Sequence, residues 1–215
     1  MSTIKKIRVL IADDHAILRA GLKQLLMATN DIEVIAEAQN AAEAMKLAIQ
    51  LDPDVLLLDI ALPDRSGIDA LKYIKKENPH VAVLMLSMYK EEQYAVRALK
   101  SGASGYLCKQ SASNELENAI RAVAKGKKYI TPEVAEILAS HVETETSKPL
   151  HELLSDREFE TLTMIAAGLS VSEIADKLAL SVKTVSMYRT RLLEKMQLRH
   201  NADIMHYVIK NNLDA

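Results

Sequence analysis

Five short apolar runs rich in Val, Ile and Leu alternate with longer stretches that carry an apolar residue every third or fourth position, from residue 7 to about 126. Uninterrupted apolar runs of this length are typical of parallel strands that helices cover on both faces. Five strands alternating with five helices predict an α/β fold, with an open, doubly wound parallel sheet. The predicted strands are 8–12, 32–36, 55–60, 81–87 and 105–108, and the first four helical stretches are 16–28, 41–51, 68–76 and 93–100.

The pattern changes after Gly126, and from Ser155 on the chain carries helix signals only. A helix is predicted from Pro132 to about residue 141, followed by a polar linker over 142–152. Two capping boxes, each a Ser with Glu three residues later, precede apolar stripes. They predict an all-α domain with helices at 155–168, 170–178, 182–196 and 201–212. The expected organisation is a first domain at 1–127, a helix and linker at 128–152, and a helical domain at 153–215.

Composition excludes several classes of protein. The chain has 215 residues, of which 49% are hydrophobic and 26% charged, and Cys108 is its single cysteine, so neither a disulfide scaffold nor a cysteine-rich zinc site is expected. No apolar run approaches the roughly 18–20 residues of a membrane helix, and acidic residues at 13–14 interrupt the N-terminal apolar run too early for a signal peptide. A cytoplasmic protein is therefore expected. The net charge of −2 means that nucleic-acid binding would need a local basic patch.

Polar residues follow or end four of the five predicted strands: Asp13 and Asp14, Asp59, Ser87, and Lys109. In an open parallel sheet the carboxyl ends of the strands form the ligand-binding edge. Three carboxylates there repel one another unless a cation compensates them, and Mg²⁺ prefers such oxygen ligands. A magnesium ion, a lysine and a hydroxyl group together suit a phosphoryl group. We expect Asp59 to be the nucleophile, because the apolar run before it places it rigidly in the centre of the sheet.

The third helix of the C-terminal domain combines an apolar stripe with a concentration of positive charge. The stripe consists of Val185, Tyr188, Leu192 and Met196, which must face the core. Between residues 183 and 199 there are five basic residues and one acidic residue. Because two short helices precede it with a tight turn, the pattern predicts a helix-turn-helix that binds DNA. Arg189 lies at an angle near the stripe, so it either contacts phosphate or bridges to a neighbouring helix. The predicted DNA-binding residues are Lys183, Thr184, Ser186, Met187, Thr190 and Arg191.

The N-terminal part resembles the receiver domain of two-component response regulators. The acidic pair, Asp59, Ser87 and Lys109 fall on that family's motif positions, as do Pro63 and Gly67 in the loop after the phosphoacceptor. The resemblance implies a flavodoxin-like (βα)5 fold and phosphorylation of Asp59 by a sensor histidine kinase or phosphotransfer protein. It also implies direct Mg²⁺ binding by Asp14, Asp59 and the Ala61 carbonyl, with Asp13 acting through water. Ser87 and Tyr106 would act as the switch residues. Gln110 stands where many receivers carry Pro, which leaves the conformation of the peptide after Lys109 open.

The C-terminal part resembles the LuxR-type helix-turn-helix in residues 154–158 (LSDRE), 168–170 (GLS), 173–175 (EIA) and 181–185 (SVKTV). Ser155 stands where that family commonly has Thr, which keeps the cap. Over its full length the chain is similar to NarL/FixJ-family response regulators. This implies that helix 182–196 enters the major groove and that helix 201–212 supports a homodimer on double-stranded DNA. The implied role is control of transcription by phosphorylation. RNA polymerase is a further partner that this role would allow.

Three other classes of protein share some of these features. A haloacid-dehalogenase-like phosphatase uses similar groups but needs a second Asp two residues after its nucleophile, where this chain has Ala61. No turnover of an external substrate is therefore expected, only the uptake and slow loss of the protein's own phosphoryl group. A flavodoxin-like electron carrier would need a hydroxyl- and Gly-rich loop, which residues 14–17 do not form. A helical domain that binds protein or RNA remains open, and duplex binding by residues 150–215 would distinguish it.

Overall fold

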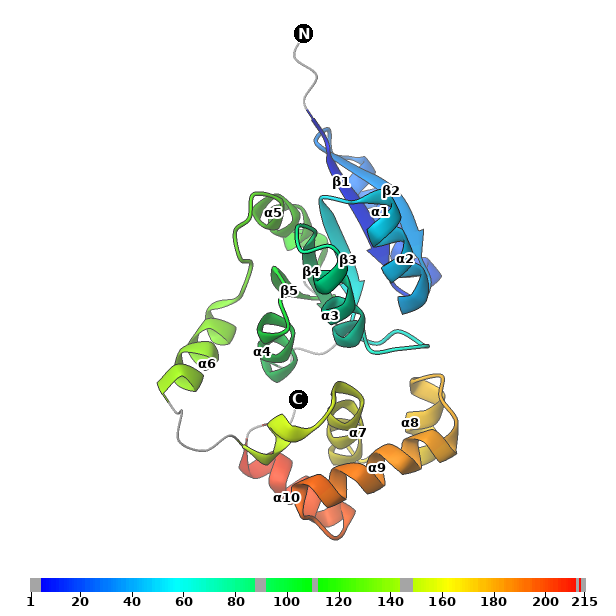
Figure 1. The fold of residues 1–215 in the computed structure, drawn as a ribbon, viewed down its shortest axis with the longest axis vertical. Coiled ribbons are helices and arrows are strands. Elements are labelled where there is room, and N and C mark those ends of the chain that lie inside the picture. The colour runs from blue at the N-terminus through cyan, green and yellow to red at the C-terminus, as the bar shows by residue number, and fades with distance from the viewer. Residues whose placement is uncertain (1–4, 88–91, 110–111, 144–148, 212, 214–215) are drawn as a thin grey trace. The chain divides into compact units, whose positions relative to one another are not determined.

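The chain folds as two compact units, residues 1–137 and 138–215, in the computed structural model (Figure 1). The structure describes residues 5–87, 92–109, 112–143, 149–211 and 213. The peptide between Lys109 and Gln110, left open by the sequence, lies outside these residues. None of the helices in the described ranges combines the length and the apolar character that crossing a membrane requires.

The first unit is a five-stranded parallel sheet with the order β2-β1-β3-β4-β5. The doubly wound α/β fold predicted from the apolar runs is confirmed. Each observed strand begins and ends within two residues of its predicted position. The strands are β1 (Ile7–Ala12), β2 (Ile32–Ala38), β3 (Val55–Asp59), β4 (Ala82–Ser87) and β5 (Gly105–Cys108).

Helices cover both faces of this sheet (Figure 1). One face packs against α1 (Ala16–Met27) and α5 (Ala112–Ala124). The other packs against α2 (Ala41–Leu51), α3 (Gly67–Glu77) and α4 (Glu92–Lys100). This double cover explains why the strands are apolar at nearly every position rather than at alternate ones.

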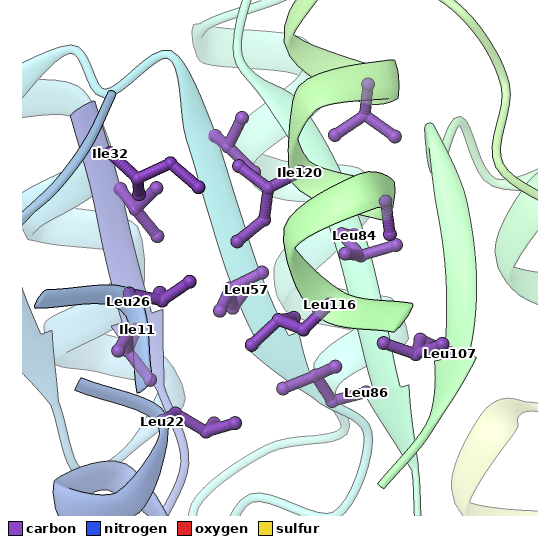
Figure 2. Packing of buried hydrophobic residues seen from close by; sticks show 14 of the residues in the cluster. Ile11, Leu22, Leu26, Ile32, Leu57, Leu84, Leu86, Leu107, Leu116 and Ile120 are labelled. Carbon is purple, nitrogen blue, oxygen red and sulfur yellow. The ribbon is translucent and has the colours of Figure 1, made fainter. Parts of the chain in front are cut away.

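The core between the sheet and the first pair of helices is built from branched aliphatic side chains. Figure 2 shows Leu57 of β3 and Leu84 of β4 lying against Leu116 and Ile120 of α5, all of them fully buried. Leu26 of α1 extends this layer over β1. Because these contacts hold the strands against α1 and α5, they help to fix the position of the residues at the strand ends.

The parallel register brings the polar strand ends to one edge of the sheet. Ala12 of β1 pairs with Leu58, so Asp13 follows directly beside Asp59. Asp59 in turn pairs with Leu86 of β4, one residue before Ser87. Ser87 pairs with Cys108, one residue before Lys109.

The segment after α5 adds a short pairing to the edge of the sheet. Tyr129 forms a short parallel bridge with Gly105, at the free edge of β5. The Tyr106 N–H donates to the Tyr129 carbonyl at 3.1 Å, and the Tyr129 N–H donates to Ser104 at 3.0 Å. A Cβ at position 105 would lie 2.6 Å from the Tyr129 carbonyl oxygen, so this close approach requires Gly. The helix predicted from residue 132 is α6 (Pro132–Glu143).

The second unit is helical, as predicted. It consists of the 3-10 helix η1 (Leu150–Leu153), α7 (Asp156–Ala166), α8 (Val171–Lys177), α9 (Val182–Met196) and α10 (Asn201–Lys210). Both predicted capping boxes are present, at Ser155 and at Ser170. Sequence analysis missed η1, which occupies part of the predicted linker, because a single 3-10 turn has no apolar period. The turn between α8 and α9 contains Ala179 in the left-handed region, at φ 52°.

Candidate functional site

Two buried carboxylates and a buried ammonium group meet at the carboxyl edge of the sheet. Lys109 Nζ lies 2.7 Å from Asp13 Oδ2 and 2.7 Å from Asp59 Oδ2. The side chains of all three residues are almost completely buried, with at most 3% exposed. The convergence expected from the strand ends is thus observed for these three residues.

Burial and charge act against each other in this group. Burial raises the pKa of Asp59, and the Asp13 charge raises it further, while Lys109 and the Ala61 N–H oppose the change without cancelling it. Burial alone would lower the pKa of Lys109, but the two carboxylates outweigh it and raise that pKa. Lys109 is therefore held in its charged form beside two acids that lack full compensation.

Asp14 and His15 complete the acidic edge on the solvent side. The His15 N–H donates to Asp13 Oδ1 at 2.8 Å, and its ring Nδ1 lies 2.7 Å from Asp14 Oδ1. Asp13, Asp14, His15 and Asp59 offer ligand atoms that all lie within 4.8 Å of one another. Among the described residues, Oδ2 of Asp13 and Oδ2 of Asp59 accept no hydrogen bond of good geometry. Buried oxygens of this kind fit a hard divalent cation.

The loop after Asp59 is held tightly against β3. The Gly67 N–H donates to the Ile60 carbonyl at 2.7 Å, and Ala61 bridges to Ser66. A Cβ at position 67 would lie only 2.0 Å from the Asp59 carbonyl oxygen. Gly67 is therefore required for the loop to pack beside Asp59, which explains its place in the sequence motif.

Ser87 and Tyr106, the two expected switch residues, lie on neighbouring strands. Ser87 ends β4 and is 1% exposed, and its carbonyl accepts a hydrogen bond from the Lys109 N–H at 2.8 Å. Tyr106 lies three residues before Lys109 on β5 and is 5% exposed. Both are thus built into the strands that lead to the acidic edge.

Sequence analysis missed one residue that contacts this edge and one that holds the loop after β3. Arg19 of α1 donates from Nη1 to the Asp13 carbonyl oxygen at 2.6 Å. Asp64 accepts hydrogen bonds from the N–H groups of Ala41 and Ala42, at 2.8 and 2.9 Å, and so ties the loop after β3 to the start of α2. Arg19 could have been found from the sequence, because it is a charged residue in line with Leu22 on an apolar stripe. Asp64 had none, because its partners are more than 20 residues away.

The α9 helix has the two faces that the sequence predicted. Val185, Leu192 and Met196 are buried, and Tyr188 is half-buried. Of the predicted DNA-binding residues, Thr184 is half-buried and lies beside the Ser181 cap. The others are exposed to solvent, namely Lys183, Ser186, Met187, Thr190 and Arg191.

Two of the five basic residues of this region are engaged within the helical unit. Lys195 Nζ lies 2.6 Å from Glu158 Oε2 on α7. Burial raises the pKa of Glu158, but Lys195 and the Ser155 N–H outweigh burial and lower it. Arg189 donates from Nε to Asn201 Oδ1 at 2.8 Å, so of the two roles left open for it the structure shows the bridge to a neighbouring helix. Lys183, Arg191 and Arg199 remain exposed on the surface.

A doubly wound sheet with this acidic edge, followed by a capped helix-turn-helix, defines the class of two-component response regulators. Residues 9–121 match the model of the response regulator receiver domain, and residues 152–208 match that of bacterial regulatory proteins of the luxR family. The chain belongs to the NarL/FixJ-type response regulators, which join a receiver domain to a LuxR-type DNA-binding domain.

Relatives match over nearly the whole chain. Oxygen regulatory protein NreC of Staphylococcus carnosus (strain TM300) is 35% identical over 213 residues, covering 96% of this chain and 98% of its own. NreC of Staphylococcus aureus (strain MRSA252) is 36% identical with the same coverage. Among solved structures, RcsB from Salmonella enterica serovar Typhimurium, bound to promoter P1flhDC with the phosphomimetic BeF3⁻, is 28% identical, with a TM-score of 0.63 and coverage of 96% of this chain and 100% of that one.

Proposed function

We propose that Asp59 accepts a phosphoryl group from a phosphohistidine of a sensor kinase or phosphotransfer protein, and that this modification controls binding of the α9 helix to DNA. The observation that carries the proposal is the position of Asp59. Its carboxylate lies buried at the end of the central strand, 2.7 Å from Lys109 and beside Asp13. The membership of the family and the match to a receiver domain support it.

The transfer exchanges one bond to phosphorus for another. An Asp59 carboxylate oxygen attacks phosphorus, and the P–N bond of the donor breaks as its imidazole leaves with the electron pair. Lys109 remains within ion-pair distance of Asp59 and places its positive charge beside the oxygens of the incoming group. The Ser87 hydroxyl is proposed to donate a hydrogen bond to one of them. Water later hydrolyses the acyl phosphate slowly, which releases inorganic phosphate and restores the Asp59 carboxylate. The protein thus loses only its own phosphoryl group, and no turnover of external phosphoesters is expected.

Magnesium is the proposed cofactor. Asp14, Asp59 and the Ala61 carbonyl would hold it directly, and Asp13 through water. When bound, it neutralises charge on the phosphoryl oxygens during transfer. The residues fit this ion, because two buried carboxylate oxygens share a single ammonium group as their compensation.

The DNA interface is proposed to be the exposed face of α9. Lys183 and Arg191 would contact phosphates, and Thr184, Ser186, Met187 and Thr190 would lie near base edges in the major groove. The helix α10 is proposed to support a homodimer that reads half-sites about one helical turn apart. The similar RcsB structure, which is bound to promoter DNA, supports this interpretation. A function in binding DNA also favours a location in the cytoplasm.

The switch is proposed to begin at the phosphoryl group. Ser87 would move toward it and Tyr106 would rotate, which remodels the surface near α4 and β5 and changes the dimerisation or inhibition of the DNA-binding domain. The proposed boundaries remain a receiver at 1–127, a connecting helix and linker at 128–152, and the DNA-binding domain at 153–215.

The test is phosphorylation of the full chain by acetyl phosphate in the presence of Mg²⁺, followed by intact mass spectrometry. We expect one phosphoryl increment in the natural protein and none in Asp59→Asn. Asp69→Asn, which removes an exposed carboxylate on α3, is the matched control and should label normally. Equal labelling of Asp59→Asn and the natural protein would show that the nucleophile is a different residue.

A further inference from the structure

Arg19 is a charged residue inside an apolar helix stripe. It precedes Leu22 by three residues and Leu26 by seven, and both leucines belong to the core beneath α1. Its side chain is only 9% exposed. Burying a guanidinium group is unfavourable unless it is hydrogen-bonded or paired. The contacts of Arg19 therefore indicate what keeps it in this position.

The shortest of these contacts is to the backbone of the acidic edge. Arg19 Nη1 donates to the Asp13 carbonyl oxygen at 2.6 Å. Its Nε lies 3.6 Å from Glu37 Oε2, and Glu37 is itself 2.8 Å from Lys23. Within the described part of the chain this Nε makes no hydrogen bond of good geometry. The interaction with Asp13 is thus the main polar contact of a buried cation.

That hydrogen bond completes a set of contacts around Asp13. Its N–H donates to the Ala38 carbonyl at 3.2 Å, its Oδ1 accepts from the His15 N–H, and its Oδ2 pairs with Lys109. Arg19 holds the remaining polar group, the carbonyl that begins the peptide between Asp13 and Asp14. The Asp14 side chain is 35% exposed and forms an ion pair with the exposed His15 ring. Because no buried partner holds it among the ion pairs of the described residues, the direction of its carboxylate depends on the peptide that carries it.

We propose that Arg19 is a positioning residue for the divalent-cation site. It fixes the Asp13–Asp14 peptide and so holds both carboxylates in the direction that binding requires. The inference depends on the proposed function, because that function supplies the cation. Without the Arg19 side chain, a buried carbonyl loses its donor, and the loop gains freedom that the cation must remove when it binds.

Cation affinity tests this directly, with Mn²⁺ as the probe and electron paramagnetic resonance of the full chain as the measurement. Loss of a group that orients metal ligands commonly lowers metal affinity about 10- to 100-fold. We expect Arg19→Met to weaken Mn²⁺ binding about tenfold or more. Arg19→Lys keeps the charge but loses the planar fork, so we expect an intermediate loss. Lys23→Met is the matched control on the same helix, because it removes a partner of Glu37 without contacting Asp13.

A second readout separates positioning from damage to the fold. If Arg19 acts through the cation, raising Mg²⁺ to saturation should restore the rate of phosphorylation of Arg19→Met by acetyl phosphate. The proposal would be overturned if Arg19→Met bound Mn²⁺ as tightly as the natural protein. It would also be overturned if Lys23→Met lost as much Mn²⁺ affinity as Arg19→Met. Should Arg19→Met not fold, the affinity of Arg19→Lys decides in the same way. Failure of the natural protein to bind Mn²⁺ would instead contradict the cation site of the proposed function.

Discussion

Two Gly→Ala substitutions in the receiver unit should have opposite effects on stability. A Cβ at position 67 would lie 2.0 Å from the Asp59 carbonyl oxygen, and within 2.9 Å of two further backbone atoms. Backbone must therefore move by about 1 Å before an alanine fits. Gly21, on the exposed side of α1, has nothing within 4 Å of the same added atom.

The expected magnitudes follow from these surroundings. Overpacking against a rigid neighbour commonly costs 1–3 kcal/mol, and because the neighbours of position 67 are backbone, we expect about 3 kcal/mol for Gly67→Ala. Replacing an exposed helical Gly by Ala removes chain entropy from the unfolded state, so Gly21→Ala should stabilise the unit by about 0.5–1 kcal/mol.

Hydrogen exchange followed by mass spectrometry is the suitable assay, because it reports the opening free energy of β3 in the full chain even if the two units unfold separately. Exchange of the β3 amides should accelerate about 100-fold or more in Gly67→Ala and slow down in Gly21→Ala. Phosphorylation of Asp59 should slow in Gly67→Ala, because the added Cβ displaces the backbone of Asp59 itself. It should remain unchanged in Gly21→Ala. Similar exchange in the two variants would refute the claim that Gly67 is required by its contact with β3.

Two further outcomes concern the DNA-binding unit. The pKa of Glu158 is lowered in the folded protein, so its stabilising effect is complete above the ordinary glutamate pKa and is lost as the pH falls below about 4.5. In a series of circular-dichroism melts at different pH values, Glu158→Gln should flatten this part of the curve of stability against pH. An unchanged acid dependence would contradict the Lys195 pairing. In gel-shift titrations, Lys183→Ala should weaken binding to specific and scrambled duplexes alike and reduce the salt slope by about one, whereas Met187→Ala should mainly change which sites are preferred. Lys195→Ala is the control, since that charge is engaged by Glu158, and an equal salt slope for the two lysine variants would contradict the assignment.

The number of basic residues in and after α9 does not give the positive charge that its surface presents. The sequence gives five basic residues to the region from Lys183 to Arg199. In the folded unit Lys195 is paired with Glu158, and Arg189 is bonded to Asn201. Both partners come from other helices, and the helical period of α9 alone contains no information about them. The number of cations available to DNA is therefore smaller than the sequence indicates.

The sequence by itself determined the strands, the main helices and the edge at which the polar residues gather. Apolar periodicity and capping residues act over a few positions, so they could be read directly, and the parallel order of strands then brings Asp13, Asp59 and Lys109 together. Only the tertiary structure decided which groups hold these residues in place. The Arg19 contact with the Asp13 carbonyl, the Asp64 contacts with the start of α2, and the pairing of Tyr129 with β5 all join segments whose distance in space no local pattern specifies. Hydrogen bonds between such segments form only after the sheet and its helices have packed.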